Sequence, residues 1–121
     1  IPKREFTRLA EELLRILKPD GVIVHRVDLK DHLGGNLNNL RFSEATWEGA
    51  LFRNSGFYTN RIRFREMLGV FERAGFECRL PRVVRWAKLP IPHTKLDPSF
   101  RHLPDEDLLV SGFDIVLKIK G

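Results

Sequence analysis

Four ionisable residues follow one apolar segment of the sequence, and their types and spacing could do chemistry. The segment GVIVHRV, residues 21–27, is followed by Asp28, Lys30, Asp31 and His32. The segment predicts a strand, and in open α/β sheets ligands bind beyond the carboxyl ends of the strands. Because a histidine near carboxylates can remove a proton from a hydroxyl or an amine, His32 is a candidate general base, oriented by Asp28 or Asp31. The alternative is that both carboxylates cap a turn or a short helix and that His32 is merely exposed.

A second group of candidates lies just before the second long helix that the sequence predicts. Its members are Tyr58, Asn60, Arg61 and Arg63. Arginine presents its N–H donors in a planar fork that matches carboxylates and phosphates, so this group could hold an anionic or sugar-like acceptor. The same residues could equally be surface residues and contacts at the start of a helix.

The region from residue 30 to residue 60 has no long periodic pattern, and we expect it to be a lid or a substrate-side insertion. An irregular connection of this length between core elements is usually a lid or a binding loop. Within it, Ser43–Phe52 predicts one short helix capped by Ser43. Gly34-Gly35 is interpreted as part of a loop rather than a cradle for a phosphate or a cofactor. Trp47 could line an apolar wall of the lid, as a substrate contact, or could belong to a small core that folds the insertion.

Hydrophobic periodicity predicts two long helices and three strands, with one helical turn in PDEDLLV before the last strand. The first strand is a near-continuous apolar run, which is typical of a strand covered by helices on both faces, and His25 should then be packed within it. The second strand contains Pro81, which predicts a bulge or an edge position. The last strand alternates apolar and polar residues, so one of its faces should be covered. The expected elements are helices at 5–18 and 60–75 and strands at 22–29, 76–86 and 112–121.

Composition limits the class of protein. A chain of 121 residues suits a single domain, and its only cysteine, Cys78, permits neither an internal disulfide nor a cysteine metal cluster, so a cytoplasmic setting is expected. No apolar run approaches the ~20 residues of a membrane span. Lys and Arg outnumber Asp and Glu by 21 to 16, but they are spread along the chain, which argues against a dedicated nucleic-acid surface. His93 and His102 have no partner at metal-ligand spacing, so no metal site is expected.

The order of these elements, with ELLRILKPDGVIVH and FERAGFECR, resembles the C-terminal half of a class I S-adenosylmethionine-dependent methyltransferase. In that family a helix ending in a lysine-proline-glycine turn leads into the fifth strand, and a helix ending in alanine-glycine-phenylalanine leads into the sixth. A seventh strand returns antiparallel and inserts between them. The blocks VDLKDH, LRFSEATW, SGFYTNRIR and DEDLLV are similar to a narrower bacterial subgroup. The resemblance implies the C-terminal portion of a Rossmann-like methyltransferase fold over residues 1–121. Its small mixed sheet would have the order five, seven, six, with flanking helices.

The resemblance also implies what the chain lacks. The family binds its cofactor on the first half of the sheet, where a glycine-rich turn and an acid at the end of the second strand contact the methyl donor. Neither feature is present, so S-adenosylmethionine is expected in a full-length parent and no cofactor is expected for this chain alone. The parent would transfer a methyl group to a small-molecule or sugar-like acceptor.

A fifth strand without its usual neighbour has a bare edge, so we expect a homo-oligomer, either simple or domain-swapped. Two alternatives stay open at this point. One is a stand-alone α/β binding module that oligomerises and has no catalysis. The other is a basic nucleic-acid-associated domain.

Overall fold

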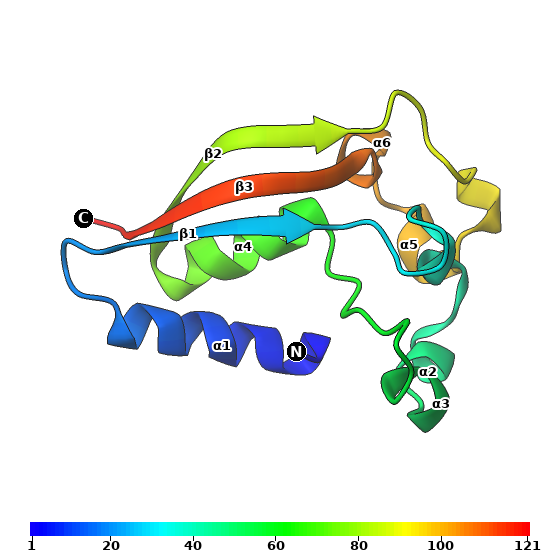
Figure 1. The fold of residues 1–121 in the computed structure, drawn as a ribbon, viewed down its shortest axis with the longest axis horizontal. Coiled ribbons are helices and arrows are strands. Elements are labelled where there is room, and N and C mark those ends of the chain that lie inside the picture. Colours follow the sequence, from blue (N-terminus) through cyan, green and yellow to red (C-terminus); the bar gives the residue numbers. More distant parts are fainter.

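The computed structural model describes all residues from 1 to 121, and its centre is a three-stranded sheet (Figure 1). The strands are β1 (Val22–Asp28), β2 (Phe76–Arg85) and β3 (Val110–Ile119), in the spatial order β1-β3-β2. The last strand therefore lies between the other two, as expected, and the α/β class with a small sheet and flanking helices is confirmed. Both hydrogen-bonded pairs are antiparallel, so the sheet is antiparallel rather than mixed.

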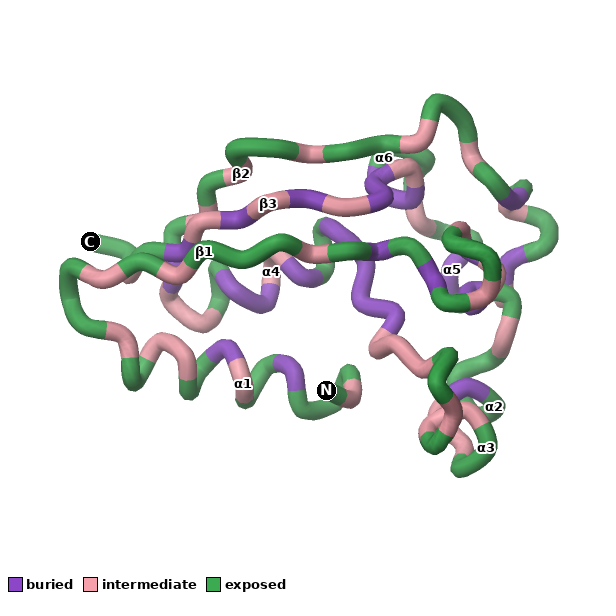
Figure 2. Tube along the Cα trace, viewed as in Figure 1, coloured by how far each residue is buried: buried purple, intermediate pink, exposed green.

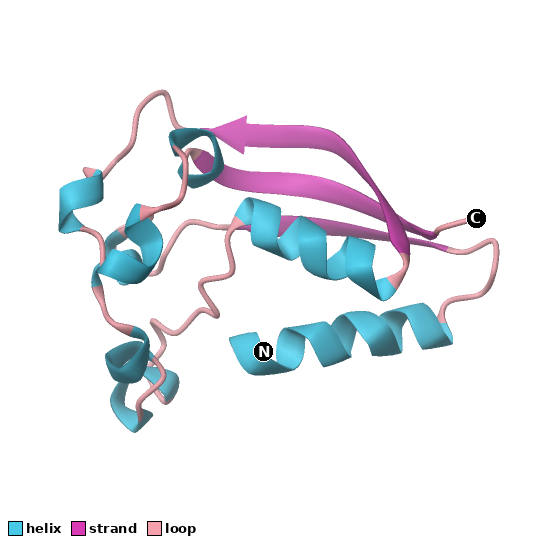
Figure 3. Cartoon of the chain, turned by 180° about the vertical axis from the view of Figure 1, so that it is seen from behind, coloured by secondary structure: helices cyan, strands magenta, loops and turns pink.

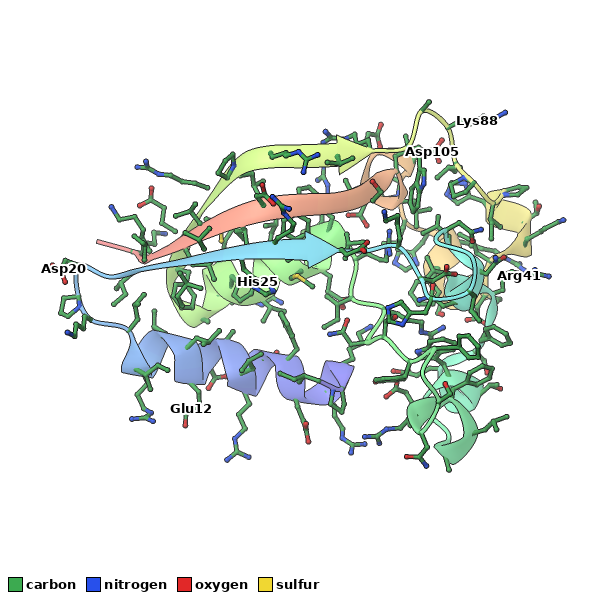
Figure 4. All side chains as sticks on the ribbon, viewed as in Figure 1. Glu12, Asp20, His25, Arg41, Lys88 and Asp105 are labelled. Atoms are coloured by element: carbon green, nitrogen blue, oxygen red, sulfur yellow. The ribbon has the colours of Figure 1, made fainter.

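Two long helices, α1 (Lys3–Ile16) and α4 (Phe64–Ala74), lie on the same face of the sheet (Figure 3). They pack against each other through Phe6 and Phe71, whose ring centroids are 5.5 Å apart in an edge-on arrangement. Gly75 ends α4 in the left-handed conformation, with φ of 117°, which confirms the helix stop predicted from the sequence. On the outer surface of α1, Glu12 points away from the sheet (Figure 4).

The main core lies between the sheet and α4. Phe113, Ile115 and Leu117 alternate along β3 and are almost fully buried, and Phe113 contacts Phe64 of α4 at a centroid distance of 4.9 Å. Burial of each such side chain contributes about 1.5–3 kcal/mol. The intervening residues of β3 point to the other face, which carries no helix. The expectation of one covered face for the last strand is confirmed.

The expectation for β1 was wrong. Val22 and Val24 are 52% and 69% exposed, and His25 is exposed rather than packed in the strand (Figure 2). Val22 and Val24 pair with Lys118 and Val116 of β3 and point to the face of the sheet that carries no helix, whereas Ile23 and Val27 point to the helix side and pack against the main core. An apolar strand sequence is compatible with burial of both faces, but burial also requires a helix or another strand to pack on each face.

The prediction that Pro81 places a bulge in the second strand, or places that strand at an edge, is confirmed. β2 is an edge strand of the sheet, and its register against β3 shifts between Arg79 and Arg82, around Pro81. A proline lacks the N–H that a ladder needs, so the bulge removes the conflict.

Beyond the carboxyl ends of β1 and β2, short helices form a second, smaller core. Its buried members are Leu37, Leu40, Ile91, Leu96, Phe100 and Leu108. The expected single helix at Ser43–Phe52 is divided at Gly49 into two. Ser43 caps the first of them, since its hydroxyl accepts the N–H of Thr46 at 3.2 Å. The short elements are η1 (Asn38–Arg41), α2 (Glu44–Trp47), α3 (Ala50–Arg53), η2 (His93–Lys95), α5 (Pro98–Arg101) and α6 (Asp105–Leu108).

This second core joins the insertion, residues 30–60, to a proline-rich arm, residues 86–108. The backbone N–H of Asp97 in the arm donates to the carbonyl of Leu40 in the insertion at 2.8 Å. The insertion is thus attached to the arm by both packing and hydrogen bonding. None of the helices is both long and apolar enough to cross a membrane.

Candidate functional site

Asp31 is the anchor of the turn that follows β1. Its side chain is buried, with 4% of the residue exposed. Its two carboxylate oxygens accept three backbone N–H groups at 2.8–3.2 Å: those of Leu33, Asn36 and Asn39. Gly34 and Gly35 have φ of 103° and 71°, so they provide the left-handed backbone that lets the chain turn around the carboxylate. The Gly-Gly pair therefore belongs to a loop, and Asp31 has the turn-capping role that was the alternative to orienting His32.

His32 is exposed, and its contact is with a backbone carbonyl. Its Nδ1 lies 3.1 Å from the carbonyl oxygen of Gly56. When Nδ1 carries the proton and donates to this carbonyl, the lone pair is on Nε2, which is then the basic atom. Asp28, the other expected orienting residue, accepts the backbone N–H of Lys30 at 2.9 Å instead. The arrangement gives His32 an orienting acceptor, but that acceptor is Gly56 rather than a carboxylate.

Arg61 is buried and connects segments of the insertion. Its guanidinium donates to the carbonyl oxygens of Asn39 at 3.1 Å and Phe42 at 2.7 Å. The same group lies over two aromatic rings, 5.3 Å from the Trp47 centroid and 4.8 Å from that of Phe100. Arg61 also has a positive φ of 57°, which a non-glycine residue adopts only where the surrounding contacts hold it.

Arg63 has a similar role at the junction of the insertion and the sheet. It is 3% exposed and donates from its two terminal nitrogens to the carbonyl oxygens of Leu29 (3.2 Å) and Val110 (3.3 Å). Burial lowers the pKa of Arg63 to about 10, although the carboxylates of Asp107 and Asp31 oppose the drop. Both terminal nitrogens of Arg63 and one terminal nitrogen of Arg61 are thus bonded within the protein, so the fork of Arg63 is not open to an anion.

Trp47 and Tyr58 belong to an aromatic cluster inside the insertion. Trp47 is fully buried, stacks with Phe42 and Phe52, and donates from its indole nitrogen to the Thr59 carbonyl at 2.8 Å. It therefore belongs to a small core, the other of the two interpretations considered from the sequence. Tyr58 stacks on it at a centroid distance of 6.1 Å.

The hydroxyl of Tyr58 is 3.1 Å from both carboxylate oxygens of Glu48 and donates to this group. Burial raises the pKa of Tyr58, and the hydrogen bond to Glu48 and the charge of that carboxylate raise it further. Asn60 makes a local contact, since its side-chain oxygen accepts the backbone N–H of Ile62 at 3.0 Å.

A cavity of about 60 Å³ lies at the carboxyl end of β1, where open α/β sheets bind ligands. Its lining consists of residues 27–30 and 59–63, with Asn39 and Met67. The structure thus brings Asp28, Asn60, Arg61 and Arg63 together around one space. Asp31, His32, Tyr58 and Trp47 do not line it.

The chain was compared with protein-family models, with curated proteins and with solved structures. No match was found.

A larger groove, of about 690 Å³, was not foreseen from the sequence. It lies between the start of α1, helix α2 and helix α4, and Lys3 and Glu66 form an ion pair across it at 3.5 Å. Ile62 lines both the groove and the cavity, so the segment 59–63 separates the two spaces. No group of His, Cys, Asp and Glu side chains is arranged to hold a metal ion.

Two lining residues of the cavity, Asn39 and Thr59, were also missed as site residues. The amide nitrogen of Asn39 donates to the Thr59 hydroxyl at 3.0 Å, and Asn39 is 3% exposed. The only feature of the sequence at this position is the pair Asn38-Asn39, which is typical of a loop and does not predict that Asn39 is buried.

Proposed function

We propose that this chain is the acceptor side of a class I S-adenosylmethionine-dependent methyltransferase. The observation that carries the proposal is the strand order β1-β3-β2, with the last strand antiparallel between the two that precede it. This is the order five, seven, six that the resemblance implied. The two long helices end in the lysine-proline and alanine-glycine-phenylalanine sequences that lead into β1 and β2.

The unpaired edge of β1 supports the same proposal. In the proposed parent, this edge would pair with the neighbouring strand of the donor-binding half, and a further element on the open face of the sheet would cover Val22 and Val24. Apolar residues on a strand that has no covering element are expected where a further element docks.

The residues of this chain do not fit the methyl donor. Its two adjacent glycines turn around Asp31, and the next element is the short helix η1 rather than a long helix. The proposal therefore assigns donor binding to residues outside these 121 and assigns acceptor binding to this chain. His32 is proposed to receive the proton of an acceptor hydroxyl on Nε2, with the Gly56 carbonyl holding the ring. The parent would act on a small-molecule or sugar-like acceptor in the cytoplasm.

The experiment is a transfer assay on the full translated product of the gene. Radiolabelled S-adenosylmethionine is supplied together with pooled nucleotide sugars and free sugars. Incorporation of label into an acceptor supports the proposal. A gene product without a glycine-rich turn upstream of these residues, and without transfer to any acceptor, contradicts it.

The bare edge of β1 also supports a second candidate, an α/β module that oligomerises and has no catalysis. In that case a second copy of the chain occupies the edge of β1 in the native protein. The two candidates differ in one measurable property, because only the first predicts that residues outside this chain bind the methyl donor.

A further inference from the structure

Two buried polar atoms around the cavity at the end of β1 have no hydrogen-bond partner. They are Oδ1 of Asn39 and Nε of Arg63, and each of these residues is 3% exposed. Both residues line the cavity. A buried polar atom without a partner costs roughly 1–3 kcal/mol, so binding of a water or of a polar ligand group at these atoms would be favourable.

From these atoms we infer that the cavity binds a hydroxyl group of a polyol or sugar. A hydroxyl both donates and accepts, so it supplies the donor that Asn39 Oδ1 lacks and the acceptor that Arg63 Nε lacks. The inference rests on the proposed function for the role of this hydroxyl, which would belong to the methyl acceptor. The binding itself requires no methyl donor.

The donors that remain argue against an anion. A carboxylate or phosphate is best held by two parallel N–H groups of an arginine fork. The terminal nitrogens of Arg63 are already bonded to Leu29 and Val110, and only its single Nε–H is left. Charge alone does not exclude an anion, because Lys30 and Arg61 line the cavity together with Asp28. One N–H and one amide oxygen match a single hydroxyl.

The orientation of the Asn39 amide does not alter this conclusion. In the present orientation, Nδ2 donates to the Thr59 hydroxyl and Oδ1 is left without a partner. If the amide were rotated by half a turn, Oδ1 would accept from Thr59 and Nδ2 would be the free atom. A ligand hydroxyl could then accept from Nδ2, since its oxygen has two lone pairs.

The size and the rim of the cavity also suit such a group. A single water needs ~10–15 Å³, so about 60 Å³ leaves room for a hydroxymethyl group. Asp28 and Lys30 line the cavity and are exposed, so the rest of a ligand can extend into solvent. Their charged groups are positioned to contact further hydroxyls of the same molecule.

The test is a titration of the ¹⁵N-labelled chain with D-glucose, followed through the Nε–H resonance of Arg63 by NMR. The expected result is a saturable shift of this resonance, with no comparable shift caused by sodium acetate. In Arg63→Lys, which keeps the charge but lacks Nε, affinity measured on the backbone amides of residues 59–63 should fall about tenfold. The matched control is Arg65→Lys, because the Arg65 side chain is exposed and does not line the cavity; its affinity should be unchanged.

Three results would overturn the inference. One is an Arg63 Nε–H that contacts only a long-lived water and does not respond to D-glucose. Another is a response to acetate but not to the sugar, and the third is an equal response of both resonances, Arg63 and Arg65. The wild-type titration decides the matter even if Arg63→Lys does not fold. Since no methyl donor is used, loss of this binding is distinguishable from failure of the proposed transfer reaction.

Discussion

The carboxylate of Asp107 accepts a hydrogen bond from the backbone N–H of Arg65 at 2.8 Å. This contact joins α6 to the first turn of α4, which has no capping side chain of its own. Asp107 is 1% exposed, and its charge also opposes the loss of the Arg63 proton. The carboxylate of Asp107 therefore has two roles. It caps α4, and its negative charge acts on Arg63, the residue that joins the insertion to the sheet.

Removal of this cap should destabilise the fold. We expect Asp107→Ala to lower the free energy of unfolding by about 2–3 kcal/mol, because the N–H of Arg65 loses its acceptor and Arg63 loses a neighbouring negative charge. Asp107→Asn keeps an acceptor oxygen and should cost less. Urea denaturation measures both. Glu106→Ala is the control, since Glu106 is exposed on the same helix and should change stability by at most ~0.5 kcal/mol. Equal effects of Asp107→Ala and Glu106→Ala would contradict the capping role.

Alanine substitutions at Asp31 and at Asp28 should differ in their effect on the stability of the fold, although both residues were candidates to orient His32. Asp31→Ala leaves three backbone N–H groups without their acceptor, and we expect a loss of about 2–4 kcal/mol. Asp28→Ala removes one hydrogen bond at an exposed position and should cost under ~1 kcal/mol. Thermal unfolding followed by circular dichroism compares the two. A cost for Asp28→Ala as large as that for Asp31→Ala would be inconsistent with the observed hydrogen bonds.

Tyr58 is the only tyrosine, so the ultraviolet absorbance of phenolate reports on it alone. Its pKa should be above the ordinary value of 10.0, because burial and the Glu48 carboxylate disfavour the phenolate. Glu48→Gln should lower this pKa, whereas Glu44→Gln, one turn earlier on α2, should leave it unchanged. No difference between the two variants would count against the contact with Glu48.

The same shift predicts how stability depends on pH. A raised pKa in the folded state means that the folded chain retains the Tyr58 proton after the unfolded chain has begun to lose it. The contribution of Tyr58 to stability is thus fully present below pH 10.0 and is lost as the pH rises through the higher pKa of the folded state. Urea titrations on either side of pH 10.0 should show a smaller loss for Tyr58→Phe than for the wild type. An equal loss in both proteins would remove Tyr58 as the cause.

The edge of β1 should cause self-association of the 121-residue chain. Val24 is 69% exposed on this edge strand, and a lysine there would disfavour both pairing and burial. We expect the wild-type chain to form dimers or larger species by light scattering and Val24→Lys to shift it toward the monomer. Leu51→Lys is the control, because Leu51 is 81% exposed on α3, outside the sheet. A wild-type chain that is monomeric at micromolar concentration would contradict this prediction.

The sequence predicted those elements whose determinants are local. The alternation along β3, the glycine after α4 and the proline in β2 each fix a backbone or burial property by themselves, and each prediction is confirmed. The exposure of Val22 and Val24 in β1 could not be predicted in this way, because it depends on whether an element covers the second face of the sheet.

The candidate site was predicted less well, for a different physical reason. Arginine is most often exposed, yet Arg61 and Arg63 are buried because their donors satisfy carbonyl oxygens at the ends of strands and short helices. Which carbonyls lack a partner is decided by the tertiary fold and leaves no pattern in the sequence. The structure has a cavity beyond β1, where the sequence placed the candidate site, but the contacts of each side chain could not be predicted.

The central claim is that this chain binds the acceptor while other residues of the same protein bind the methyl donor. The most direct measurement is a calorimetric titration of S-adenosylmethionine into the 121-residue chain and, in parallel, into the full translated product of the gene. The account predicts no heat of binding for the chain alone and saturable binding for the full product. Saturable binding of S-adenosylmethionine by the chain alone, or none by the full product, would contradict it.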